Sequence, residues 1–265
     1  MSCQLILVGD NTLISDTRIG LNCRNLTIDG SGTLSISAPA DYGLHATGSM
    51  CIKDGKITAE SAEGTLLLST LFQMEGGYLS STATAEGSCG LEFAASVLSG
   101  GTLIGRGDSM GVSTLRSGPE VQIGPGVHVY AYANSGSGMN SYDINVNGGS
   151  LTASSVEGAA VATHITFTSG SLIAEGNQAL SKAPTISADP YAWRTDKDGE
   201  YTDSATTAYA YSDTQTYVDF TTDDIPTTEP SLSPESVDYD KATATAGAST
   251  TLSLTEVALG ERPLL

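Results

Sequence analysis

Apolar residues recur along this chain in a short unit: two apolar residues two positions apart, a glycine-containing corner, and a further apolar residue. Residues 26–34, Leu-Thr-Ile-Asp-Gly-Ser-Gly-Thr-Leu, show the unit clearly. A period of two places alternate side chains on one face of a strand. The corner residues of eight successive units are Asn11, Gly32, Gly55, Gly77, Gly101, Gly126, Gly149 and Gly170.

Successive corners are 21, 23, 22, 24, 25, 23 and 21 residues apart. A period in the low twenties with strand-type alternation is typical of one turn of a β-solenoid. Helical repeats would need apolar residues at spacings of three and four, and the chain lacks that pattern. We therefore predict an all-β fold, a right-handed single-stranded parallel β-helix of about eight coils over residues 1–183 with a C-terminal cap.

Equivalent positions of the units form apolar columns that predict the strand register. Before the corner, the pattern aligns Leu5 with Leu26, and it stacks Ile28, Ile52 and Met74 in sequence. Two residues after the corner lie Leu13, Leu34, Ile57, Leu79, Leu103, His128, Leu151 and Leu172. His128 interrupts this column, so we expect Val127 or Val129 to point inward and the imidazole to point outward.

The repeat stops near Ala183, and the sequence changes character. Residues 184–220 hold Trp193 and five of the eleven tyrosines, as expected of an aromatic cap over the open end of a solenoid. Residues 221–230 are rich in Thr, Asp, Glu and Pro and indicate a linker. Residues 231–265 are too few for an independent core, and we predict an incomplete module or a disordered tail.

Charge and composition exclude several classes of protein. Asp and Glu number 30 against 11 Lys and Arg, which gives a net charge of −19 and excludes nucleic acid as a partner. No run of 18 apolar residues exists, so we expect no membrane span. The first residues carry no targeting signal, and because the repeat already runs at Leu5 we expect a missing start. The four cysteines form no CxxC pair and indicate buried, unbonded thiols.

A second column consists mostly of acids and follows the second strand of each coil. Its members are Asp41, Glu63, Glu86, Asp108, Asn134, Glu157 and, in a looser register, Glu175. Two charges about 5 Å apart repel by roughly 3 kcal/mol at an effective dielectric of 20. Two alternatives follow. Either the first six residues bind Ca²⁺, which would turn the repulsion between the acids into attraction to the ion, or the acids splay into solvent.

Catalytic motifs are weak in this sequence. Residues 107–111 match the GxSxG nucleophile elbow, but they fall in a coil corner and not in a strand-to-helix turn. Asp223 and Asp224 are the only adjacent aspartates, and they lie in the predicted linker. Arg106 and Arg116 lie near Asp108 without a distinctive spacing and indicate surface cations. We therefore predict that the protein is not an enzyme.

Five tyrosines fall near the corners of separate coils and are candidates for sugar contacts. An aromatic ring on a sheet surface packs against the CH groups of a sugar face. The alternative is that the rings cover sheet edges and pack against the cap. The candidate residues are Tyr42, Tyr78, Tyr130, Tyr132 and Tyr142.

Two features together resemble the bacterial carbohydrate-binding β-helix proteins, also called carbohydrate-binding domain-containing proteins. One is the coil unit with its Gly-Gly-Thr-Leu corner at residues 100–103. The other is Tyr-Ala-Trp-Arg-Thr at residues 191–195 followed by Tyr-Val-Asp-Phe at residues 217–220. The resemblance covers residues 5–220. Residues 230–241 resemble the opening of an immunoglobulin-like module.

The resemblance implies a surface or secreted protein, and one branch of that family binds cellulose and acidic pectin with calcium. By this resemblance, Asp41 in Asp-Tyr-Gly-Leu matches the corner where calcium ligands would be sought. We therefore expect non-catalytic, extracellular or cell-surface binding of a polysaccharide, cellulose-like or pectin-like, assisted by calcium, within a larger multidomain protein. The alternatives are a structural stalk or adhesin without glycan binding, and a degenerate polysaccharide lyase or hydrolase.

Overall fold

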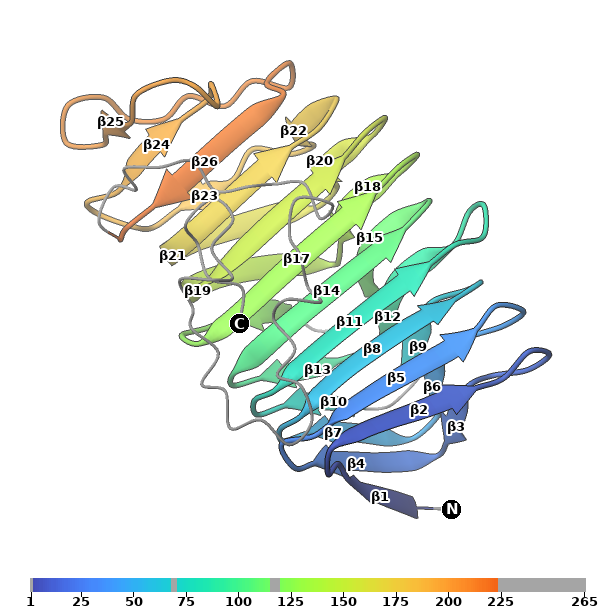
Figure 1. The fold of residues 1–265 in the computed structure, drawn as a ribbon. Helices are drawn as coiled ribbons and strands as arrows, with labels where there is room; N and C mark the ends of the chain where they lie inside the picture. The colour runs from blue at the N-terminus through green and yellow to red at the C-terminus, as the bar shows by residue number, and fades with distance from the viewer. Residues whose placement is uncertain (1, 68–70, 115–119, 224–265) are drawn as a thin grey trace.

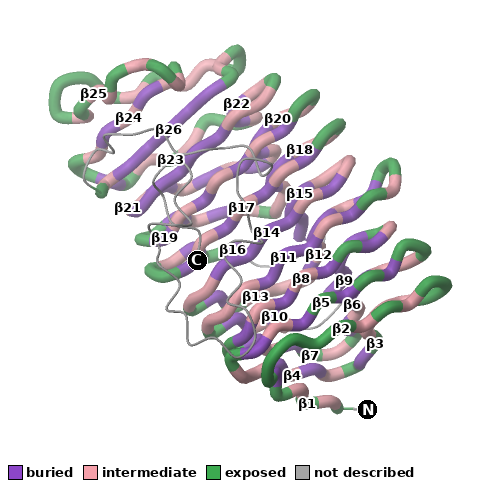
Figure 2. The backbone as a smooth tube through the Cα atoms, in the orientation of Figure 1, coloured by how far each residue is buried: buried purple, intermediate pink, exposed green. Residues whose placement is uncertain are grey.

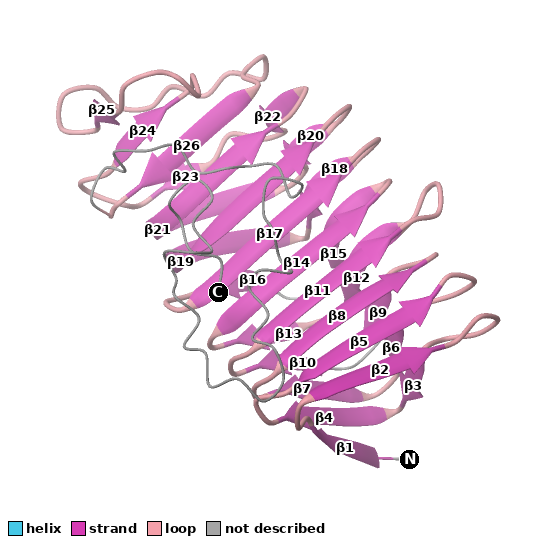
Figure 3. Cartoon of the chain, in the orientation of Figure 1, coloured by secondary structure: helices cyan, strands magenta, loops and turns pink. Residues whose placement is uncertain are grey.

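The computed structural model describes residues 2–67, 71–114 and 120–223. Over these residues the chain contains strands and turns and no helix (Figure 3). Parallel strands stack into three sheets that wind around one core, which is a β-solenoid of about eight turns (Figure 1). The predicted parallel β-helix fold is therefore confirmed.

Each turn of the solenoid passes through the three sheets in order, which we name sheets A, B and C. Sheet A comprises β1 (Ser2–Ile6), β4 (Asn25–Asp29), β7 (Ser49–Ile52), β10 (Leu71–Met74) and β13 (Ser96–Leu98). Sheet B begins with β2 (Asp10–Ile14), β5 (Thr33–Ala38), β8 (Lys56–Ser61), β11 (Tyr78–Ala83), β14 (Gly101–Gly107) and β17 (Val127–Ala133). Two long strands, β19 (Asp143–Ser155) and β21 (His164–Glu175), continue it, and β16 (Val121–Ile123) pairs with β19.

Sheet C and the C-terminal strands complete the fold. Sheet C comprises β3 (Leu21–Cys23), β6 (Leu44–Ala46), β9 (Thr65–Leu67), β12 (Cys89–Phe93), β15 (Met110–Thr114), β18 (Ser137–Asn140), β20 (Ala159–Val161) and β22 (Gln178–Leu180). The remaining strands are β23 (Thr185–Ile186), β24 (Ala192–Arg194), β25 (Thr202–Asp203) and β26 (Tyr217–Thr221).

The apolar columns stack as the sequence pattern predicts. Ile28 pairs with Ile52, and Ile52 pairs with Met74; all three are at most 1% exposed. Leu103 pairs with Val129, so Val129 takes the inward position and His128 lies half-buried on the other face. Figure 2 shows buried segments repeated from turn to turn along the solenoid.

The first coil differs from the predicted alignment by two residues. Leu5 pairs with Ile28 and not with Leu26, and Leu13 pairs with Ile36 and not with Leu34. The corner is therefore Gly9, with a φ of 63°, and not Asn11. A shift of two residues keeps every side chain on its own face, so alternation alone could not distinguish the two registers.

The cap closes the C-terminal end of the solenoid. β26 runs antiparallel to β21, and the ring of Phe220 lies 5.6 Å from that of Phe167. Tyr209 packs edge-on against Phe220 at 4.8 Å, and Trp193 lies 5.5 Å from Tyr209. Backbone N–H groups of the last coil donate to cap carbonyls, as Ala179 does to Gln215 at 2.7 Å. The rings thus cover the core, while these hydrogen bonds satisfy the exposed backbone.

Three further predictions have outcomes in the fold. All four cysteines are unbonded, but only Cys23 is buried, and Cys3, Cys51 and Cys89 are half-buried. The predicted linker begins inside β26, because Thr221 is the last residue of that strand. Residues 224–265, which hold most of the linker and the predicted module or tail, lie outside the described residues. Among the described residues, no helix is long and apolar enough to cross a membrane.

Candidate functional site

The predicted acid column lies at one corner of the solenoid, between sheets B and C. Its six members occupy the turns that join a sheet B strand to the following sheet C strand: Asp41, Glu63, Glu86, Asp108, Asn134 and Glu157. Backbone hydrogen bonds link neighbouring turns, and Glu157 N donates to Asn134 O at 2.9 Å. Glu175 belongs elsewhere, because it is the last residue of β21 and pairs with Ser154 on the strand.

The side chains of this corner bear on the calcium prediction. Among the described residues, no group of three or more His, Cys, Asp or Glu side chains there is placed to hold an ion. Asp108 Oδ2 already accepts the N–H of Gly87 at 2.8 Å and the hydroxyl of Ser135 at 3.2 Å. Through these two hydrogen bonds the carboxylate joins three consecutive turns. The predicted calcium site stays a prediction.

The five candidate tyrosines divide among three places. Tyr78 on β11 and Tyr130 and Tyr132 on β17 share the outer face of sheet B. Tyr42 lies in the turn after β5 and stacks on His45 at 5.8 Å, and burial followed by the charge of Glu63 raises the pKa of its phenol. Tyr142 follows β18 and is 70% exposed. The structure thus brings three of the five onto one surface.

One register column on the outer face of sheet B places Tyr132 among polar side chains. Five consecutive strands contribute Thr82, Arg106, Tyr132, Ser154 and Glu175, each paired with the next. With about 4.8 Å between strands, the column runs for roughly 19 Å along the solenoid axis. This column forms the floor of two cavities that meet at Tyr132.

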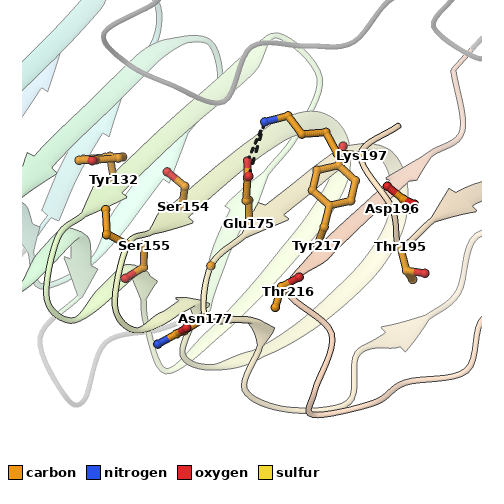
Figure 4. Close-up of a pocket in the computed structure, with 12 residues that line it drawn as sticks. Tyr132, Ser154, Ser155, Glu175, Asn177, Thr195, Asp196, Lys197, Thr216 and Tyr217 are labelled. Carbon is orange, nitrogen blue, oxygen red and sulfur yellow. Dashed lines mark hydrogen bonds and ion pairs between the residues drawn. The ribbon is translucent and has the colours of Figure 1, made fainter. Parts of the chain in front are cut away.

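The first cavity, of about 720 Å³, lies between Tyr132 and the cap. Figure 4 shows Tyr132, Ser154 and Glu175 in a row, with Lys197 and Tyr217 of the cap beyond them. Lys197 Nζ pairs with Glu175 Oε2 at 3.2 Å. Arg194 Nη1 donates to the carbonyl of Lys197 at 2.7 Å, so the buried cap residue holds the loop that borders the cavity.

The second cavity, of about 610 Å³, lies on the other side of Tyr132. Its floor is Thr82, Arg106 and Tyr132. Its wall includes three members of the acid corner, Glu86, Asp108 and Asn134. We call the two cavities together the Tyr132 groove, with a cap-side cavity and a distal cavity.

Sequence reasoning identified Tyr132 and the acid wall but missed the rest of the groove. Thr82, Arg106, Ser154 and Glu175 each lie five residues past the corner glycine of their coil, and Tyr132 lies six past Gly126. This nearly constant offset was a usable signal for the groove. The cap residues were not accessible in this way, because nothing in the repeat predicts which face the cap loop covers.

A separate cavity of about 800 Å³ lies on the outer face of sheet C, lined by Glu92, Asn140, Tyr142 and Lys182 among others. Burial raises the pKa of Glu92. Burial and the nearby Glu92 raise the pKa of the Cys89 thiol to about 12. Tyr142 is the only predicted sugar-binding tyrosine that lines it, so this cavity gathers fewer of the candidates than the groove does.

The GxSxG match does not form a nucleophile elbow. Ser109 lies in the two-residue turn between β14 and β15, and its neighbours are strands.

Comparison with known proteins adds no relative, since no family model, curated protein or solved structure matches the chain.

Proposed function

We propose that the protein binds an extended polysaccharide in the Tyr132 groove without cleaving it. The observation that carries this proposal is the position of Tyr132, whose ring stands between two cavities on a floor that runs along the solenoid axis. A long, straight ligand suits a long, straight floor. A ring at its midpoint offers a sugar face a surface to stack on.

The chemistry of the groove supports a hydroxyl-rich ligand. Ser154, Thr82 and Asn134 present hydroxyl and amide groups, which both donate and accept hydrogen bonds. Carboxylates accept from two sugar hydroxyls at once, and these charge-assisted bonds are the stronger kind. An aromatic platform with polar groups beside it holds a sugar by its apolar face and its edge together.

The positions and ion pairs of the carboxylates in the groove favour binding without cleavage. Glycoside hydrolysis needs two carboxyl groups, one on each side of the bond, acting as acid and as base or nucleophile. Glu175 is paired with Lys197, and the two carboxylates of the distal cavity, Glu86 and Asp108, come from adjacent turns of the same corner and so stand on one side of a ligand in the groove. The degenerate lyase or hydrolase and the ligand-free stalk remain as outcomes of the test.

We expect the protein to lie outside the cell or on the cell surface, where such polysaccharides occur. The proposal does not invoke calcium, because no group of three His, Cys, Asp or Glu side chains gathers at the corner among the described residues. A net charge of −19 would repel an anionic glycan over the whole molecule. We therefore expect neutral or cationic polysaccharides to bind better than pectin-like ones.

Retention of the full chain on insoluble cellulose, chitin and pectin, with calcium and with chelator, tests the proposal. We expect retention on at least one of the three, and no change on chelation. Stacking contributes about 1 kcal/mol, so Tyr132→Ala should weaken binding roughly fivefold. Tyr142→Ala removes the same ring from another face and serves as the matched control.

Three results would contradict parts of this account. Absence of retention on every glycan would favour the stalk. Equal losses for Tyr132→Ala and Tyr142→Ala would remove the groove as the site. New reducing ends or unsaturated products in the supernatant would establish an enzyme.

A further inference from the structure

We propose that the distal cavity of the Tyr132 groove selects sugars that carry a protonated amino group, so that the ligand is a polysaccharide with unacetylated amino sugars. This inference rests on the proposed polysaccharide binding and names the class of sugar that the groove prefers. It follows from the cavity, from the ring at its end and from the hydrogen bonds that its carboxylates lack.

The lining of the distal cavity combines an aromatic platform with two carboxylates. Glu86 and Asp108 stand on the wall, and Tyr132 closes one end. Among the described residues, the lining contains one basic residue, Arg106, whose Nη1 donates to Ser80 Oγ at 3.4 Å. The lining therefore holds two acids and one base.

The two acids retain capacity to accept hydrogen bonds. Asp108 uses Oδ2 for the N–H of Gly87 and the hydroxyl of Ser135, and these two bonds fix the carboxylate in place. Within the described part of the chain, Asp108 Oδ1 and the Glu86 carboxylate accept no hydrogen bond and form no ion pair. An ammonium group is a compact donor of three hydrogen bonds and suits two such acceptors.

The cap-side cavity differs, and this makes the preference local. There Glu175 is neutralised by Lys197, and the remaining acid, Asp196, uses Oδ1 to accept the N–H of Asp198 in its own turn. Within the described residues, a sugar on that side meets the Lys197–Glu175 pair, a single carboxylate with one free oxygen, and several hydroxyl and amide groups, whereas the distal cavity offers two unpaired carboxylates. The amino-sugar preference therefore belongs to the part of the ligand beyond Tyr132, next to Glu86.

The test uses three soluble hexasaccharides, of β-1,4-linked glucose, N-acetylglucosamine and glucosamine. Calorimetry on the full chain at pH 5.5 and physiological salt compares their affinities. Exposed charge pairs contribute up to about 1 kcal/mol, so we expect the glucosamine hexamer to bind roughly fivefold more tightly than the glucose hexamer. Acetylation removes the charge, so the N-acetylglucosamine hexamer should lose the advantage.

Glu86→Gln is the decisive variant, and Glu157→Gln is its matched control. Both change one exposed acid of the same corner by the same charge, but Glu157 lines neither cavity. We expect Glu86→Gln to abolish the preference and Glu157→Gln to retain it. Equal effects of the two variants would attribute the preference to net charge and overturn the inference.

The possible results distinguish failure of the amino-sugar preference from failure of polysaccharide binding itself. If the glucose and glucosamine hexamers bind equally and Tyr132→Ala weakens both, polysaccharide binding stands and the amino-sugar preference is wrong. If no hexamer binds, or if Tyr132→Ala changes nothing, both proposals fail.

Discussion

The corner between sheets A and B needs glycine for two reasons: the backbone there has a positive φ, and the preceding coil leaves no room for a side chain. Gly101 has a φ of 96°, in the region that side chains disfavour. A Cβ added there would lie 2.7 Å from the carbonyl oxygen of Gly77 in the preceding coil. The stacking of coils therefore depends on a missing side chain at this position.

Replacing this glycine should cost stability. We expect Gly101→Ala to lower the free energy of unfolding by about 1–3 kcal/mol, since the strained backbone and the contact with Gly77 both oppose the methyl group. Urea unfolding followed by circular dichroism measures the change. Gly124→Ala is the control, because an added Cβ there meets nothing nearer than 3.9 Å. Equal stability of the two variants would contradict the argument.

Individual residues were predictable where the pattern of faces decides them. The alternation required an inward residue beside His128, and Val129 fills that place. It did not decide the first coil, where Leu5 and Leu13 pair two residues away from the predicted partners. A repeat specifies which face a residue takes more strongly than which partner it meets.

At the scale of elements, a buried ion pair joins two strands of the cap. Arg194 and Asp219 are 7% and 0% exposed, and Arg194 Nη2 lies 3.1 Å from Asp219 Oδ2. The hydroxyl groups of Tyr201 and Tyr217 donate to the same oxygen. The guanidinium also lies 4.6 Å from the ring of Tyr201. Strands β24 and β26 are held together by charge and by these rings.

Removing one partner of this pair should destabilise the protein strongly. We expect Arg194→Met to lower the free energy of unfolding by about 3–5 kcal/mol, because it leaves the Asp219 carboxylate buried without its cation. Lys197→Met breaks the exposed pair with Glu175 and should cost less than about 1 kcal/mol. Thermal and urea unfolding of both variants make the comparison. A loss for Arg194→Met as small as that for Lys197→Met would show that the pair does not hold the cap.

The elements themselves followed from the repeat, but their contacts across the cap did not. Trp193 and the tyrosines of residues 184–220 indicated aromatic packing, and Tyr209 and Phe220 supply it. No sequence signal placed Lys197 over sheet B, because the path of an irregular segment depends on tertiary contacts such as that of Arg194 with the Lys197 carbonyl. The cap-side wall of the groove was therefore beyond prediction.

At the scale of the whole molecule, the solenoid turns a repeat of residues into rows along its axis. Inward rows make the core, and outward rows make surfaces whose length is set by the number of coils. The row from Thr82 to Glu175 is such a surface, and its chemistry varies from strand to strand because outward positions are not constrained by packing. Fold was thus predictable from the inward rows, and the site only in part from the outward ones.

The most direct test of groove binding is hydrogen exchange of the full chain with and without the glucose and glucosamine hexamers. The account predicts slower exchange in the turns beside the groove, at residues 84–87, 108–109 and 134–136, and in the cap loop at residues 195–197. Exchange should stay unchanged in the turns at residues 39–43 and in sheet A. Protection confined to other faces, or none at saturating ligand, would contradict the central claim that a polysaccharide lies along the Tyr132 groove.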